Sequence, residues 1–100
     1  MKVRFHPDAS AELDAAAVWY EQEQPGLGVA LLAELSLATV AIAEAPQTWP
    51  LVSKRRQIRR FLLARFPFAV LFVVVADGVV VLAVAHTRRR PFYWRARRLP

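Results

Sequence analysis

Hydrophobic residues form one long block near the C-terminal end of the chain, RFPFAVLFVVVADGVVVLAVAHTRRRP at 65–91. Two valine-rich runs flank Asp77-Gly78 at its midpoint. Valine favours strands, and Asp-Gly is a preferred two-residue hairpin turn because both positions tolerate positive φ. Pro67 stands at the start of the first run, where a missing N–H costs least. The pattern predicts two antiparallel strands, about 67–76 and 79–87, joined by a tight turn.

The same block is long enough to cross a bilayer as a helix. One Asp at the centre of such a helix costs roughly 3 kcal/mol, which a run of Val, Leu and Phe offsets, so hydropathy alone leaves a membrane span open. The central Asp-Gly and the two halves of matching strand length favour the hairpin. We therefore expect no membrane association.

Both faces of the predicted hairpin are apolar. Phe68, Val70, Phe72 and Val74 lie on one face of the first strand, and Ala69, Leu71, Val73 and Val75 lie on the other. Both faces should therefore be covered. For one of them two covers stay open: a partner protein, or the C-terminal tail folded back with Phe92, Tyr93 and Trp94.

Helical periodicity dominates the first half of the chain. The segment that begins at Pro7 places Leu13, Ala16 and Tyr20 at helical spacing, and Pro25-Gly26 ends it. A second helix follows, before Pro46, with one apolar stripe that comprises Leu31, Leu35, Ala38 and Ile42. The short link between them predicts a helical hairpin over about 7–45.

Two shorter segments complete the predicted fold. KVRF, before the hairpin, and RQIRRFLLAR at 57–65 both have the composition of short strands. The expected fold class is α+β in the order β-αα-βββ, as one domain over 1–100. It comprises a short N-terminal strand, the helical hairpin, a three-strand antiparallel meander over about 57–87, and a basic aromatic tail at 88–100.

Charge divides the chain into two halves. Residues 1–50 carry two basic and seven acidic residues, and residues 51–100 carry twelve basic residues and one acidic residue, so the halves have net charges of −5 and +11. This asymmetry predicts an anionic partner for the second half, either nucleic acid, an acidic protein segment or anionic lipid. The chain has no cysteine, which excludes disulfides and fits a reducing cytoplasm. We see no metal-ligand spacing and expect no cofactor.

The chain resembles the RelE/ParE superfamily of toxins from bacterial type II toxin–antitoxin systems, most closely the ParE branch of plasmid-stabilisation proteins. The resemblance rests on FHPDA at 5–9, ELDAAAVWYEQEQPGLGVALLAEL at 12–35, AP at 45–46 with WP at 49–50, RRFLLARFPFAVLF at 59–72, and AVAHTRRRPFYWRAR at 83–97. Each segment is weak alone. Together, the helix pair with its Gly-rich turn, the Arg-Phe-Pro-Phe strand entry and the order His-x-Arg-Arg-x-Pro-x-x-Trp are rather specific. The fold implied is a helical hairpin on an antiparallel sheet.

The resemblance implies partners. Toxins of this kind are neutralised by a small antitoxin whose C-terminal segment wraps the toxin, and here that segment would be amphipathic and acidic. ParE-like toxins inhibit DNA gyrase, whereas RelE-like toxins cleave mRNA in the ribosomal A site. We expect gyrase as the target, with ribosome-dependent cleavage as the alternative, and a hetero-oligomer with the antitoxin. From the residues alone, a non-toxin basic nucleic-acid-binding module also stays open, because aromatic and basic residues lie together in the second half.

Cleavage of RNA needs groups that take a proton, stabilise a phosphorane and protonate the leaving oxygen. The candidates are Arg60, Arg65, His86 and Tyr93. Each also has a structural interpretation: His86 ends an apolar strand, Tyr93 lies between two aromatic residues, and Arg65 marks a strand start. The run Lys54-Arg55-Arg56 falls in a predicted loop and is expected to be solvated.

The remaining predictions concern the surfaces that bind the target and the antitoxin. The residues expected to contact the target are Arg88, Arg89, Arg90, Trp94 and Arg95. The residues expected to contact the antitoxin are Phe68, Val70, Phe72 and Arg59. Because Arg59 and Arg60 are adjacent on a strand, they should point to opposite faces of the sheet.

Overall fold

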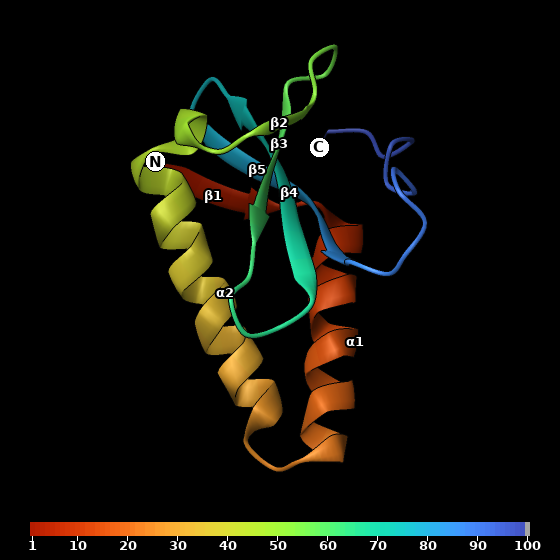
Figure 1. Cartoon of the computed structure of the whole chain (residues 1–100). Coiled ribbons are helices and arrows are strands. Elements are labelled where there is room, and N and C mark those ends of the chain that lie inside the picture. Colours follow the sequence, from red (N-terminus) through yellow and green to blue (C-terminus); the bar gives the residue numbers. More distant parts are fainter. Residues whose placement is uncertain (100) are drawn as a thin grey trace.

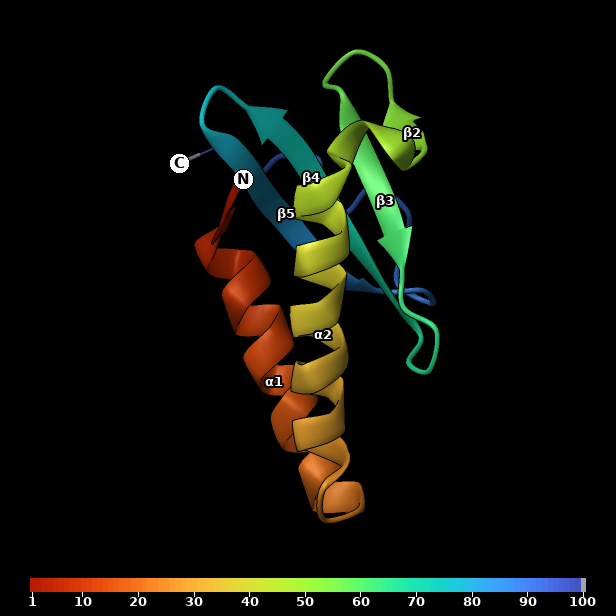
Figure 2. The same cartoon turned by 90° about the vertical axis from the view of Figure 1, so that its left-hand side faces the viewer.

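The computed structural model describes residues 1–99, in which a helical hairpin and a C-terminal tail lie on opposite faces of one sheet (Figures 1 and 2). The element order is β1 (Lys2–Phe5), α1 (Pro7–Glu23), α2 (Leu27–Glu44), a short 3₁₀ turn (Pro46–Thr48), β2 (Leu51–Ser53), β3 (Ile58–Leu62), β4 (Phe68–Val75) and β5 (Gly78–His86). The strands lie in the order β1-β5-β4-β3-β2, with β1 parallel to β5 and the other pairs antiparallel. The predicted α+β class is confirmed, while β2 and the parallel pairing of β1 were not predicted.

The helical hairpin forms where the sequence pattern places it. Pro7 begins α1, and the His6 ring caps it by accepting the Asp8 N–H at 3.0 Å. Gly26 takes a left-handed φ of 91° between the helices. The Glu21 carboxylate accepts the N–H groups of Gly26 and Gly28, which would otherwise be unpaired at the start of α2. The predicted stripe of α2 is buried at Leu31, Leu35, Ala38 and Ile42.

The β4–β5 turn differs from the prediction. Its two central residues are Ala76 and Asp77, because Val75 pairs with Gly78 across the hairpin. Gly78 has no positive φ; it is the first residue of β5. A Cβ there would lie 2.0 Å from the Lys2 carbonyl oxygen of β1. This glycine is therefore required by the close approach of β1, a contact between residues far apart in the sequence.

A β-bulge in β5 changes which residues face each side of the sheet. Leu71 pairs with Ala83 and Phe72 pairs with Val81, so Leu82 is an extra residue without a partner in β4. Val81 and Val84 both pack on the helix side, whereas Leu82 and Ala83 both pack on the tail side. The bulge thus lets a continuous apolar strand fill two separate cores.

Each face of the sheet carries its own core. On the helix side, Phe68, Val70 and Phe72 lie in a core shared with both helices and are at most 7% exposed. These three residues are therefore covered by the chain itself, and their expected contact with an antitoxin stays a prediction. On the other side, Trp94 is 5% exposed among side chains that include Leu71 and Ala85.

The tail covers the second face of the sheet, which is one of the two alternatives that the sequence left open. Tyr93 and Trp94 pack on the sheet, while Phe92 is 45% exposed. Trp94 is part of a core rather than of the exposed surface, and its expected contact with the target stays a prediction.

Within residues 1–99, α2 is long and apolar enough to span a membrane by length and composition, with a mean hydropathy of 1.8. Only 28% of this window is buried. Its inner stripe packs on the sheet side of the hairpin, as in the core helix of a globular domain. The block at 65–91 that raised the membrane alternative forms the β4–β5 hairpin instead.

Replacement of Gly78 tests the close approach of β1. Gly78→Ala should lower the free energy of unfolding by about 2 kcal/mol or more, because the new Cβ meets backbone rather than a mobile side chain. The measurement is urea unfolding followed by circular dichroism. The control is Asp77→Ala, which removes only an exposed ion pair with Arg4 and should cost less than about 1 kcal/mol. Equal stability of Gly78→Ala and the parent chain would contradict this account of β1.

Candidate functional site

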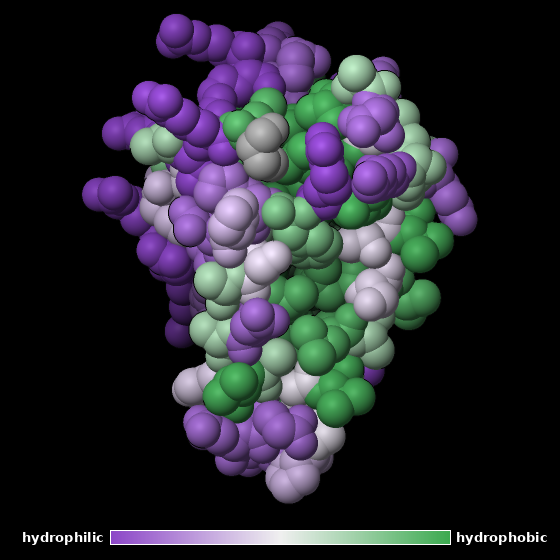
Figure 3. Space-filling view, turned by 180° about the vertical axis from the view of Figure 1, so that it is seen from behind, coloured by the Kyte–Doolittle hydropathy of each residue, from purple (hydrophilic) through white to green (hydrophobic). Residues whose placement is uncertain are grey.

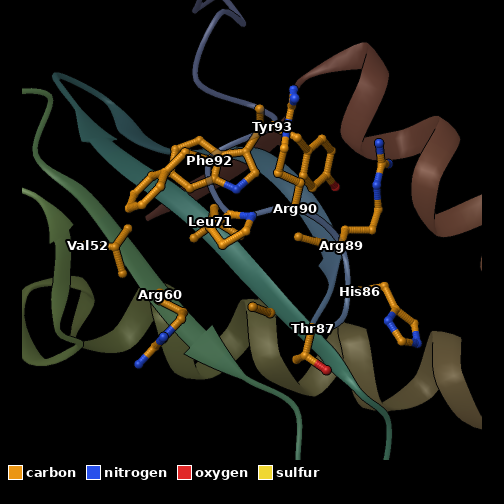
Figure 4. Close-up of a pocket in the computed structure, with 13 residues that line it drawn as sticks. Val52, Arg60, Leu71, His86, Thr87, Arg89, Arg90, Phe92 and Tyr93 are labelled. Atoms are coloured by element: carbon orange, nitrogen blue, oxygen red, sulfur yellow. The ribbon is translucent and has the colours of Figure 1, made fainter.

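A concave cleft lies between the tail and the sheet (Figure 4). Its volume is about 210 Å³. Ala69, Leu71 and Trp94 give it an apolar floor and wall. Arg60 enters from β3, and Arg90 and Phe92 enter from the tail. The cleft therefore combines an apolar interior with a basic rim.

One carboxylate on α1 holds the tail in place. Glu12 accepts two hydrogen bonds from the Arg97 guanidinium, both at 2.8 Å, and a third from the Tyr93 hydroxyl. The side chains of Glu12 and Arg97 are only 15% and 14% exposed. Arg89 lies 3.6 Å from the same carboxylate and stacks over the Tyr93 ring at 3.6 Å. Glu12 thus joins α1 to three side chains of the tail.

The Glu12–Arg97 pair also completes the edge of the sheet. Strand β1 ends at Phe5, and His6 N–H makes the last bond to β5, at the Val81 carbonyl. Beyond that point, Val84 N–H donates to Glu12 at 3.0 Å and the Leu82 carbonyl accepts from Arg97 at 3.1 Å. A parallel strand would supply one acceptor and one donor at the same two groups. The ion pair therefore replaces a strand where β1 has ended.

The contacts of the anchor determine the ionisation of Glu12 and Tyr93. Burial raises the pKa of Glu12, but hydrogen bonds from Arg97, Tyr93 and Val84 N–H outweigh burial, and the net pKa lies below its ordinary 4.5. Burial, with the hydrogen bond to Glu12, raises the pKa of Tyr93 to about 12. Tyr93 therefore stays protonated near neutral pH and acts as a hydrogen-bond donor in the fold.

A second tether comes from the β2–β3 turn. Arg56 donates to the carbonyl oxygens of Arg95 and Arg97, the latter at 2.9 Å. The expectation that 54–56 is a purely solvated loop is therefore wrong for Arg56. Arg59 is also structural, because its guanidinium donates to the carbonyls of Gln47 and Trp49 at 3.2 and 2.7 Å.

Three of the four candidate ribonuclease groups, Arg60, His86 and Tyr93, line the cleft. The His86 ring, however, lies edge-on to Phe68 at 5.2 Å and points away from Arg60 in Figure 4. His86 Nδ1 accepts the Arg88 N–H at 3.1 Å, which fixes the start of the tail. Arg65 lies over Phe66 in the β3–β4 loop. The carboxylate that accepts the Tyr93 hydroxyl is Glu12, and Arg97 already engages it.

Nine of the basic residues fall into two groups by their contacts. Arg56, Arg59, Arg89 and Arg97 are used by the fold, as described above. Among residues 1–99, no carboxylate lies within 4.0 Å of the side-chain nitrogens of five others, which are Arg60, Arg88, Arg90, Arg95 and Arg98. All five are exposed. Of the residues expected to bind a target, Arg88, Arg90 and Arg95 are therefore available at the surface, whereas Arg89 is partly engaged.

The central residue of this arrangement, Glu12, was missed from the sequence. Glu12 stands three residues after buried Ala9 and four before half-buried Ala16, so it lies on the inward face of α1. An acid on the apolar face of a helix indicates a buried partner, and this signal was available. Arg97 carries no comparable signal among so many arginines.

Comparisons with known proteins agree with the fold. A family model described as "ParE toxin of type II toxin-antitoxin system, parDE" matches residues 3–91. Among solved structures, "Chromosomal ParDE TA system from P. aeruginosa" superposes with a TM-score of 0.76 at 19% identity, over 88% of this chain and 97% of that one. No curated protein matches the sequence. The fold and the family model together define the class as the toxin component of a toxin–antitoxin system. The chain belongs to the ParE toxin family.

Removal of the Glu12 charge tests the tail anchor. Glu12→Gln should lower the free energy of unfolding by about 3 kcal/mol at pH 7, because it leaves the Arg97 guanidinium poorly compensated. Since the folded-state pKa of Glu12 is lowered, its stabilisation is fully present above about pH 4.5 and is lost as pH falls through the folded-state value. The difference between variant and parent should therefore shrink below pH 4.5. The measurement is urea unfolding between pH 3 and 7.

Asp8→Asn is the matched control for this experiment. Asp8 is one turn earlier on α1, 63% exposed, and 3.7 Å from Arg97 Nε. Its loss should cost less than about 1 kcal/mol. Similar costs for both variants, or a Glu12→Gln deficit that does not depend on pH, would show that the tail is anchored in another way.

Proposed function

We propose that this chain inhibits DNA gyrase in the cytoplasm and thereby arrests growth, until a cognate antitoxin neutralises it. The observation that carries the proposal is the set of exposed arginines on a tail fixed to the fold by Glu12. Membership of the ParE family supports gyrase as the target. The His86 ring points away from Arg60 and Arg65 does not line the cleft, which supports inhibition by binding rather than by RNA cleavage.

The surface proposed for the antitoxin is the outer side of α2. Val29, Leu32, Leu37 and Val40 are 41–71% exposed on this helix, and apolar side chains gather over the hairpin in Figure 3. A helix that is apolar on both its inner and outer sides is normally buried. An amphipathic antitoxin segment would cover the outer side in a hetero-oligomer. This surface replaces the buried residues Phe68, Val70 and Phe72, which the sequence favoured.

The target assignment predicts a direct biochemical result. The purified chain, added to gyrase with ATP and relaxed plasmid, should block supercoiling and produce gyrase-dependent DNA breaks. Arg88→Ala/Arg90→Ala should reduce inhibition at least about 10-fold, because both removed cations are exposed and unpaired. Unaffected gyrase, with a folded chain that arrests growth and cleaves mRNA on ribosomes, would contradict the proposal.

The antitoxin surface predicts a separation of toxicity from neutralisation. Leu37→Asp should keep toxicity but weaken antitoxin binding by about 30-fold or more, because it places an unpaired charge in an apolar interface. Growth rescue by co-expressed antitoxin and calorimetric binding are the measurements. The matched control is Val18→Asp on α1, which is also exposed and apolar. Full neutralisation of Leu37→Asp, or equal escape of both variants, would place the antitoxin elsewhere.

A further inference from the structure

Unpaired cations surround the cleft under the tail on two sides. Arg60 reaches it from β3 and Arg90 from the tail, and neither has a carboxylate within 4.0 Å among residues 1–99. Arg88, Arg95 and Arg98 add exposed charge along the same tail. Grouped arginines with no internal partner point to a ligand with several negative charges.

The cleft itself has the size and lining for a single flat group. Its volume of about 210 Å³ lies below the roughly 300–1,000 Å³ of sites for drug-sized molecules. Leu71 and Trp94 line it, and Phe92 stands at the rim with 45% of its surface exposed. A flat ring that enters this space would meet apolar and aromatic surface.

Phe92 is held in an unfavourable backbone conformation. Its φ is +62°, in the left-handed region that bulky side chains rarely adopt. The neighbouring residues of the tail are fastened by Tyr93 to Glu12 and by Arg56 to Arg95, so the chain cannot relax freely. The ring lies tilted against Trp94 with 5.6 Å between centroids, and 45% of the residue remains exposed. Phe92 therefore combines an unfavourable backbone conformation with a ring that is nearly half exposed beside the cleft.

We propose that this cleft binds a single-stranded segment of nucleic acid, with Arg60 and Arg90 on phosphates and one base against Phe92. Grooves for single strands combine cations along the backbone with aromatic rings for stacking. An acidic protein segment would satisfy the arginines but would not need an exposed ring over a flat space. A duplex would offer phosphates without a free base. The proposal concerns a contact of this chain alone and does not depend on gyrase.

The first experiment measures direct binding without gyrase. The full chain is titrated by fluorescence anisotropy against labelled oligo-dT of about 12 nucleotides, a length within known single-strand site sizes. The same length of oligo-U, a DNA duplex and a poly-Glu peptide are the comparison ligands. We expect both single strands to bind at least 10-fold more tightly than the duplex and the peptide. The ratio of the affinities for oligo-dT and oligo-U then identifies whether the preferred ligand is DNA or RNA, and either result supports the proposal.

Phe92→Gly separates binding from folding. Glycine adopts a φ of +62° without strain, so this variant should be as stable as the parent or more so. It should nevertheless lose about 5-fold or more in affinity for oligo-dT, because the stacking ring is gone. A Phe92→Gly variant that keeps full affinity would overturn the role of the ring.

Arg60→Ala/Arg90→Ala tests the phosphate contacts. Its affinity for oligo-dT should fall at least 10-fold, and the slope of log K against log salt should flatten by about 1.4, the value for two phosphates on a single strand. Lys2→Ala/Arg65→Ala is the matched control, since it removes the same charge from residues that do not line the cleft. Equal losses in both double variants, or poly-Glu binding as tight as oligo-dT, would overturn the proposal. Because gyrase is absent, these results are read separately from the supercoiling assay.

Discussion

The β4–β5 hairpin is apolar on both faces, and the other parts of the fold are arranged so that both faces are covered. A sheet with two apolar faces is stable in water only when both are covered. The helical hairpin covers one face with residues of both helices, and the tail covers the other with Trp94 and Tyr93. The tail is short and rich in arginine, so its few apolar contacts need polar anchors.

Those anchors arise at the place where the sheet is incomplete. Strand β1 ends at Phe5, so β5 has unpaired backbone groups beyond Val81. Glu12 and Arg97 satisfy them at Val84 and Leu82, and the same two side chains bind each other. The repair of a sheet edge and the attachment of the tail are therefore one interaction. As a result, the arginines of the tail belong to a segment that is anchored to α1 and β5.

The sequence predicted most of the helices and strands, but it did not predict which side chains the folded chain leaves exposed. Apolar periodicity placed both helices and the β4–β5 hairpin, because those signals are local. The sequence assigned Gly78 to the turn because glycine tolerates unusual backbone angles. The structure instead requires glycine at this position because the Lys2 carbonyl of β1 lies close to it. Only the folded chain brings these two residues together. Phe68 and Trp94 were assigned to partners because an apolar residue in a sequence does not reveal whether the chain covers it. Glu12 could have been found from its place on the inner face of α1, but its partners Arg97 and Tyr93 lie over 80 residues away.

Two chemically different faces result from this layering. The α2 side is apolar and nearly uncharged, while the tail side is basic with a single exposed ring at its cleft. The central claim is that the tail side meets the target and the α2 side meets the antitoxin. A photo-crosslinking amino acid placed at Phe92 or at Leu37 tests it in mixtures of the chain, gyrase, DNA and antitoxin. The account predicts crosslinks from position 92 to the gyrase–DNA complex and from position 37 to the antitoxin. The reverse pattern, or crosslinks to the antitoxin from both positions while gyrase–DNA remains unlabelled, would contradict it.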